Sequence, residues 1–468
     1  MSSMSSPALL VNILRSVTRR YRLPQGAAAS AIEIRSASPA TSLAFAIEAA
    51  REATVHGETP DAALKQRFID ALAAMIHEAM RADSGDRAFQ AMVLRHRAVQ
   101  VREYASLSAH ADQDRRQIHT MVNAIAHPAK QQRAMEGWQR EALARLHSSA
   151  SAPPCSRLRD TARNVLDLPE IVSGSEFGHA VARLLNSAAL ARACRLETLE
   201  SDPLVQQYRS LWDAYGPRPG SPEARAQGKA SQQRGAAVEA LAIRALETLA
   251  RQLNEATPRH GPSYRAVNSM RVPAAIPGSH EHAKTEWDAV LLERVLTQAA
   301  DAAPVWNVCL LVEAKASIEA ATTDLPRLMR GIRLLAHAGE GAVYAFETRQ
   351  GTVHIDGASL RALNTEPSGL NRTVLYCCDA PADGEPRLLG AASRTRLLSA
   401  QASLEFARAS CGEPPRSPEA LEPVWRELTR CPQWHGVLHQ YPTLQLVREL
   451  MVHPDDLMAA MTDASGRM

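Results

Sequence analysis

Residues 308–317 read VCLLVEAKAS, and this stretch decides the fold expected for the middle of the chain. The five residues before Glu313 are all apolar, as in a central strand that helices cover on both faces. An unpaired charge is costly inside such a layer, so we expect Glu313 and Lys315 to emerge at the end of the strand. Because side chains alternate along a strand, Leu311, Glu313 and Lys315 share one face. The stretch therefore predicts a strand that brings a carboxylate and an ammonium group to one place.

A second apolar run precedes it, in residues 286–292, which read EWDAVLL. If the two runs pair as a hairpin, Asp288 converges on Glu313. Two carboxylates held close together resist joint ionisation unless a cation lies between them, and hard oxygen ligands suit Mg²⁺ or Mn²⁺. The sequence therefore predicts a divalent metal ion bound by Asp288 and Glu313.

Lys315 is unusual in this chain, because only five of the 53 basic residues are lysines: Lys65, Lys130, Lys229, Lys284 and Lys315. A lysine beside a metal ion offers a compact positive charge with an adjustable pKa. It can orient or deprotonate a water molecule and balance negative charge that develops on a phosphate. An arginine could not act as a base.

These residues resemble the PD-(D/E)XK nucleases, whose core runs helix, three strands, helix, strand, and the resemblance covers residues 226–380. In that family a strand carrying Asp is followed by a strand ending in Glu-x-Lys, and Asp288 and Glu313-Ala314-Lys315 stand in those places. Many members add a glutamate on the first helix, often shortly after a glycine, and Glu239 in RGAAVE (residues 234–239) looks like that element.

The resemblance implies a fold, an activity and a set of site residues. The fold is an α/β nuclease-like core, and the activity is metal-dependent hydrolysis of nucleic-acid phosphodiester bonds, mostly in DNA. Asp288 and Glu313 would bind Mg²⁺ or Mn²⁺, Glu239 would assist as a ligand or through a water, and Lys315 would position the attacking water. Trp287 departs from the pattern, because it stands where the motif has proline.

Three other interpretations stay open at this point. Residues 314–321 are rich in Ala, Lys and Glu and could begin a helix, which would leave Glu313 and Lys315 as surface charges. Glu239 could equally be a solvated helix position. At the level of function, the alternative is a non-catalytic protein that uses the same fold to bind nucleic acid or protein.

The rest of the chain is rich in Ala, Leu, Arg and Glu at helical spacing, so we expect a mainly helical, multi-domain protein around this core. Proline-rich breaks and changes of pattern predict five parts. They are a disordered tail (1–39), a helical domain (40–150), a helical segment and linker (151–225), the nuclease-like domain (226–385) and a C-terminal helical region (386–468). The N-terminal helical region could bind the substrate or a protein partner.

Composition says little about the compartment and the binding partners of this protein. A formal charge of +3 neither indicates nor excludes a nucleic-acid partner. Seven cysteines without a C-x-x-C pair predict neither a zinc ribbon nor a disulfide framework and favour a reducing compartment. No apolar window is long enough to span a membrane, so we expect no membrane partner and a cytoplasmic protein. Residues 1–32 carry arginines and serines with Glu33 as the first acidic residue, so export or organelle targeting stays open.

Overall fold

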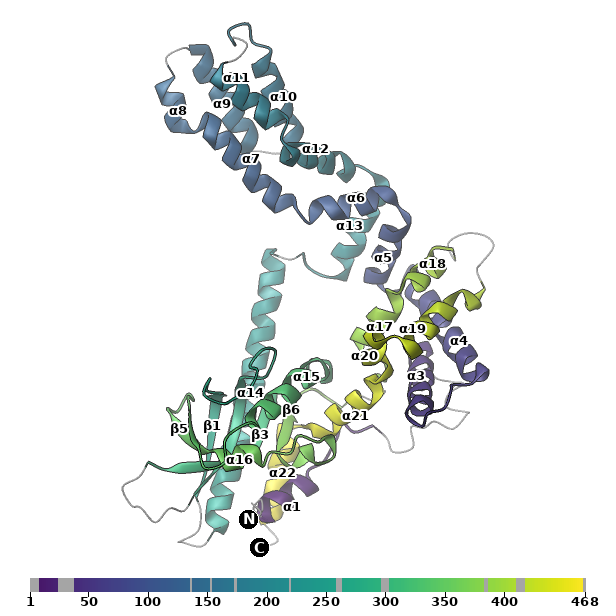
Figure 1. Ribbon diagram of the computed structural model, residues 1–468, viewed down its shortest axis with the longest axis vertical. Coiled ribbons are helices and arrows are strands. Elements are labelled where there is room, and N and C mark those ends of the chain that lie inside the picture. Colours follow the sequence, from purple (N-terminus) through teal and green to yellow (C-terminus); the bar gives the residue numbers. More distant parts are fainter. Residues whose placement is uncertain are drawn as a thin grey trace. The chain divides into compact units, whose positions relative to one another are not determined.

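The computed structural model describes residues 8–23, 38–134, 137–151, 154–171, 175–218, 220–257, 263–295, 303–382, 386–409 and 417–465. Within these ranges the chain is mainly helical and contains a mixed β-sheet (Figure 1). The chain divides into two compact units. Unit 1 comprises residues 1–72, 220–397 and 422–468, and unit 2 comprises residues 73–219 and 398–421.

Unit 1 is built around the sheet, which has seven strands within the described residues. The strands are β1 (Tyr264–Arg271), β2 (Glu286–Arg294), β3 (Val305–Ala314), β4 (Val343–Phe346), β5 (Val353–Asp356), β6 (Val374–Cys377) and β7 (Met451–Val452). Their order is β1-β2-β3-β5-β4, while β6 pairs with both β3 and β7. The antiparallel pairing of β2 with β3 confirms the predicted hairpin, whose connection includes residues 296–302, outside the described residues.

Strand β3 lies in the centre of the sheet, because it pairs with β2 along one edge and with both β5 and β6 along the other. Its first residues pair with β5 and its last four pair with β6, both in parallel. Strand β5 and the two-residue β7 were not expected from the sequence. Strand β7 is too short to show a pattern, whereas β5 alternates apolar and polar residues over only four positions, the shortest run that indicates a strand.

Helices cover both faces of the sheet, which explains why β3 is apolar at successive positions. One face carries α14 (Pro222–Ala256), α1 (Ala8–Ser16) and α22 (Pro454–Ser465), which pack on Leu291, Leu310 and Val312. The other face carries α15 (Ile318–Leu335), α16 (Gly357–Arg361) and α21 (Gln440–Leu450), which pack on Leu292, Val308 and Leu311. Unit 1 is therefore a three-layer α/β/α structure (Figure 1).

Capping residues fix where the two helices next to the central strands begin. Ser221 caps α14 and Ser317 caps α15, each by accepting a hydrogen bond from a backbone N–H in the first helical turn. Strand β3 continues to Ala314 before this cap, so Glu313 lies in the strand and is 1% exposed. The alternative in which Glu313 and Lys315 are surface charges on a helix is therefore wrong.

The N-terminal segment differs from the disordered tail expected for residues 1–39. Residues 8–16 form α1, whose Leu10 and Ile13 are fully buried. Tyr21 is 1% exposed, and its hydroxyl lies 2.8 Å from the carbonyl oxygen of Cys378. The apolar run from residue 8 packs on α14 and α22 across a long sequence separation, which composition does not reveal. Residues 1–7 and 24–37 of the expected tail lie outside the described residues.

Unit 1 also contains further helices. They are α3 (Pro39–Val55), α4 (Ala62–Ala79, which belongs to unit 1 up to Leu72), α17 (Ala391–Leu398), α19 (Glu422–Arg430), α20 (His435–Leu438), and the 3₁₀ helices η1 (Pro367–Arg372) and η3 (Pro432–Trp434). None of the described helices is long and apolar enough to span a lipid bilayer.

Unit 2 is helical throughout its described residues. Its helices are α5 (Arg87–Arg97), α6 (Val99–Ser108), α7 (Ala111–Ala126), α8 (Pro128–Arg133), α9 (Gly137–Ser151), α10 (Cys155–Leu166), α11 (Glu176–Leu185), α12 (Ala188–Glu200), α13 (Pro203–Tyr215), α18 (Gln401–Ala409) and the 3₁₀ helix η2 (Pro418–Leu421). Asp114 of α7 is buried and pairs with Arg192 of α12, which ties the two helices together.

The two units divide the chain differently from the five parts expected from the sequence. Residues 73–219 belong to one unit, although the proline-rich breaks predict separate parts at 40–150 and 151–225. Residues 40–72 and 422–468 belong with the sheet. Residue 226, where the sequence predicts that the α/β core begins, lies close to Gly220, where unit 1 resumes. Contacts between distant segments set these boundaries, and local composition does not record them.

Candidate functional site

The register of β2 against β3 places two carboxylates side by side. Ala289 pairs with Val312, so Asp288 and Glu313 follow on neighbouring strands. Oδ2 of Asp288 accepts a 2.8 Å hydrogen bond from the backbone N–H of Ala314, which fixes the orientation of its side chain. Asp288 and Glu313 thus converge, as the hairpin predicted.

Lys315 directs its ammonium group back to the same carboxylate. Nζ of Lys315 lies 2.5 Å from Oε1 of Glu313, and the Lys315 side chain is 19% exposed. The backbone N–H of Lys315 donates to the carbonyl oxygen of Cys377 at 2.9 Å, which extends the pairing of β3 with β6 by one residue. The Glu-x-Lys spacing therefore works as expected, with both side chains on one face of the sheet.

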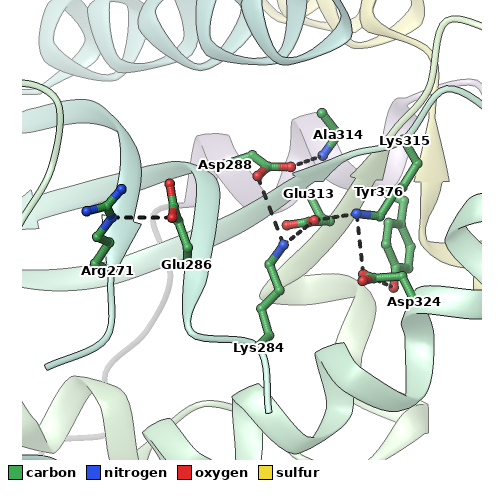
Figure 2. A network of polar contacts seen from close by, with 9 residues as sticks. All are labelled: Arg271, Lys284, Glu286, Asp288, Glu313, Ala314, Lys315, Asp324 and Tyr376. Carbon is green, nitrogen blue, oxygen red and sulfur yellow. Dashed lines mark hydrogen bonds and ion pairs between the residues drawn. The ribbon is translucent and has the colours of Figure 1, made fainter. Parts of the chain in front are cut away.

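A second lysine, Lys284, joins the pair of carboxylates. Its ammonium group donates to Oε1 of Glu313, the same atom that Lys315 contacts, and lies 4.0 Å from Oδ1 of Asp288. The side chain is only 6% exposed. Figure 2 shows the Lys284 ammonium group pointing at both carboxylates.

Asp324 lies beside Lys315, and Tyr376 lies beside Asp324. Oδ2 of Asp324, on α15, lies 3.6 Å from Nζ of Lys315. The same oxygen accepts a 3.3 Å hydrogen bond from the hydroxyl of Tyr376, on β6 (Figure 2). Lys315 is therefore held between Glu313 and Asp324.

Glu239 is half-buried on α14, the helix across the sheet from α15. Burial raises the pKa of Glu239, and the negative charge of Asp288 raises it further, while Arg349 and Lys284 oppose the shift. No hydrogen bond or ion pair links Glu239 to Glu313 or Lys315 within the described residues. The electrostatic effects of Asp288 and Lys284 on Glu239 nevertheless place Glu239 near the cluster.

Burial dominates the electrostatics of Glu313. Loss of solvation, together with the charge of Asp288, raises the pKa of Glu313 to about 7, even though Lys284 and Lys315 act in the opposite direction. For Lys315, burial lowers the pKa, but the Glu313 carboxylate and its hydrogen bond outweigh this, and the net pKa lies above the ordinary value. Lys315 is therefore a protonated, positively charged group in this state.

Asp288 and Glu313 supply the carboxylate oxygens with which this site could hold a divalent metal ion. Among the described residues, no group of three His, Cys, Asp or Glu side chains is arranged to hold a metal ion. Asp288 and Glu313 nevertheless form an adjacent carboxylate pair, and Oε2 of Glu313 is buried without a hydrogen-bond partner from the described residues. A buried carboxylate oxygen without a partner is costly, and Mg²⁺ is bound through one or two carboxylates with water completing its shell. The residues present fit such an ion.

An open pocket lies beside this cluster, on the side of α15. Its lining includes Lys315, Asp324, Ser317, Thr323 and Arg327. Lys315 therefore borders a surface that solvent and a ligand can reach.

Sequence reasoning missed Lys284, Asp324 and Tyr376. Lys284 carried one signal, because it is one of only five lysines and lies four residues before Asp288. Asp324 and Tyr376 carried none, because a single acidic residue on a helix and a tyrosine in a strand are ordinary features.

Comparison of this chain with protein-family models, with curated proteins and with solved structures found no match.

Proposed function

We propose that this protein is a metal-dependent nuclease of the PD-(D/E)XK type, which hydrolyses phosphodiester bonds in nucleic acid. The observation that carries the proposal is the convergence of Asp288, Glu313 and Lys315 at neighbouring ends of β2 and β3. The buried Glu313 and the partly exposed Asp288 and Lys315, beside an open pocket, match the residues and the order that the family resemblance implies.

The topology of unit 1 supports the proposal. The elements α14, β1, β2, β3, α15 and β6 follow one another as helix, three strands, helix, strand. Strands β4 and β5 form an antiparallel hairpin inserted between α15 and β6. The resemblance implies this core, and the inserted hairpin leaves the pairing of β3 with β6 intact.

Each site residue then has a chemical role. Asp288 and Glu313 would hold Mg²⁺ or Mn²⁺, with Glu239 assisting as a ligand or through a water. The bound ion would supply Lewis-acid activation of a phosphoryl oxygen and a water of lowered pKa. Lys315, being protonated, orients the attacking water and balances negative charge on the phosphoryl group. Asp324 positions the Lys315 ammonium group.

DNA is the proposed substrate, because the resembled family acts mostly on DNA. The N-terminal helical region, residues 40–150, is proposed to bind the substrate or a protein partner.

Incubation of the purified full chain with supercoiled plasmid DNA and Mg²⁺ tests the proposal. The wild-type protein should nick or linearise the plasmid, and EDTA should stop the reaction. Asp288→Asn and Lys315→Ala should each lower the rate by about 10²-fold or more, as loss of a charge-stabilising group does in other enzymes. Lys229→Ala, at an exposed position on α14, is the matched control.

Equal cleavage by all four proteins would show a contaminating nuclease and remove the assignment. Absence of cleavage by all four would also remove it. If the proteins bind the plasmid without cutting it, the non-catalytic alternative becomes the better account.

A further inference from the structure

Lys284 takes up the position of a cation between the two carboxylates of the site. Its ammonium group contacts Oε1 of Glu313 and lies 4.0 Å from Oδ1 of Asp288. The side chains of Lys284 and Glu313 are 6% and 1% exposed. Buried charges need partners of opposite sign, and Lys284 provides this for the carboxylate pair.

The backbone of Lys284 is held firmly against α15. Its N–H donates to the carbonyl oxygen of Arg327 at 3.1 Å. Gly331 passes so close that a Cβ atom there would lie 2.5 Å from Cβ of Lys284. Two residues earlier, His282 has φ of 56°, a left-handed conformation that is uncommon outside glycine, and its carbonyl oxygen accepts a hydrogen bond from Arg330. The irregular segment before β2 is thus built to deliver this lysine.

The two lysines of the site differ in their second partner. Lys315 contacts Glu313 and Asp324, and Asp324 is not among the proposed metal ligands. Lys284 contacts Glu313 and Asp288, which are both proposed ligands. A divalent ion on these carboxylates would therefore take both partners from Lys284, whereas Lys315 would keep Asp324.

We infer that Lys284 is the resident cation of the Asp288–Glu313 pair, and that a divalent metal ion binds to these carboxylates by displacing the Lys284 ammonium group. This inference rests on the proposed function, because it takes the two carboxylates as metal ligands. Lys284 and Lys315 already share Oε1 of Glu313, so a divalent ion on this carboxylate would bring a third cation within a few ångströms and would repel the Lys284 ammonium group strongly. The flexible side chain of Lys284 can move away while its backbone stays fixed.

Titration of the metal-free full chain with Mn²⁺, followed by calorimetry, tests the inference without any activity measurement. Lys284→Met keeps the length of the side chain and removes its charge, and it should bind Mn²⁺ at least tenfold more tightly than the wild-type protein. Lys284→Met should also lower Tm in EDTA, and Mn²⁺ should raise its Tm more than that of the wild-type protein. Lys229→Met should match the wild-type protein.

Lys315→Met distinguishes displacement from a general charge effect. Removing any nearby positive charge favours a cation, but only Lys284 competes for both carboxylates. The gain in Mn²⁺ affinity should therefore be larger for Lys284→Met than for Lys315→Met. An equal gain for both variants, or no gain for Lys284→Met, would overturn the inference.

Lys284→Gln covers the case in which Lys284→Met does not fold in EDTA, because its amide can still donate to Glu313. If both Lys284 variants are unfolded in EDTA and Mn²⁺ refolds them, this result supports the inference. If Mn²⁺ does not refold them, it contradicts the inference. Failure of every protein to bind Mn²⁺ overturns both this inference and the metal-dependent function. Tighter binding by Lys284→Met without plasmid cleavage by the wild-type protein would leave the inference standing and remove the nuclease assignment alone.

Discussion

Asp288 and Ala314 are joined by a 2.8 Å hydrogen bond from the backbone N–H of Ala314 to the Asp288 carboxylate. This bond links β2 to the end of β3 at the point where the regular ladder stops. It fixes the Asp288 side chain next to Glu313, the residue before Ala314, and so sets the spacing of the two carboxylates. A backbone N–H of this kind is available from any residue at position 314 except proline.

Gly331→Ala should disturb the site through Lys284. The new Cβ would lie 2.5 Å from Cβ and 2.8 Å from the carbonyl oxygen of Lys284, and backbone atoms cannot move aside cheaply. We expect a loss of about 1–3 kcal/mol in the free energy of unfolding, as for other overpacked positions. Urea unfolding of the full chain measures it.

The matched control is Gly228→Ala, on α14, where a Cβ would meet no atom within 4 Å. Alanine is the better helix former, so this variant should be about 0.5–1 kcal/mol more stable than the wild-type protein. Similar stability for Gly331→Ala and Gly228→Ala would contradict the close packing of α15 against Lys284.

Glu313 should make stability depend on pH in the absence of metal. Its pKa of about 7 exceeds its ordinary value of 4.5, so between these values the folded state binds more protons than the unfolded state. The stabilisation that Glu313 gives to the folded state by binding its proton more tightly is fully present below pH 4.5 and is lost as pH rises through 7. At about 1.4 kcal/mol per pKa unit, the wild-type protein should lose about 3 kcal/mol relative to Glu313→Gln across this range.

Urea unfolding in EDTA at a series of pH values from 4.5 to 8 provides the measurement. Glu313→Gln has no titrating group at this position and serves as the reference. Parallel stability curves for the two proteins would show that Glu313 titrates normally, and the account of its burial would then fail.

Tyr21 should stabilise unit 1, because its buried hydroxyl lies 2.8 Å from the carbonyl oxygen of Cys378 and 2.6 Å from that of Ala380. Tyr21→Phe leaves these acceptors without their donor, and we expect a loss of about 1–3 kcal/mol in the free energy of unfolding. Tyr215→Phe, on α13 at a residue that is 64% exposed, should have no measurable effect. If Tyr21→Phe is equally silent, the hydrogen bonds of the Tyr21 hydroxyl do not stabilise unit 1.

Asp324 should act on the reaction by positioning Lys315. Asp324→Asn removes the second charge that holds the Lys315 ammonium group, and supporting residues of this kind typically contribute 10- to 100-fold to activity. With a DNA duplex as substrate, kcat should fall by about that factor while KM stays nearly constant. Tyr376→Phe removes only a 3.3 Å hydrogen bond to Asp324 and should have a smaller effect. A change confined to KM would assign Asp324 to substrate binding instead.

Part of this site could be predicted from sequence because its pattern is local. The apolar run before Glu313, the alternation that aligns Glu313 with Lys315, and the second run beginning at Asp288 all follow from period two. These features predicted the hairpin and the convergence of its charges. Ser317, which follows the strand and caps α15, is also a local feature of the sequence.

The remainder depends on contacts between distant segments. Lys284 precedes β2 in an irregular segment whose path is set by Gly331, 47 residues later. No periodicity marks such a segment. Asp324 and Tyr376 meet only because β6 returns beside β3 in parallel after the β4–β5 hairpin. The same reasoning explains why α1 was missed, since its partners α14 and α22 lie more than 200 residues away along the chain.

The most direct test of the central claim is anomalous diffraction from crystals of the full chain soaked in Mn²⁺. The account predicts an anomalous peak within about 2.0–2.6 Å of a carboxylate oxygen of both Asp288 and Glu313, with the Lys284 ammonium group moved away from Oε1 of Glu313. A peak bound elsewhere, or no peak with Lys284 still in contact with Glu313, would contradict it.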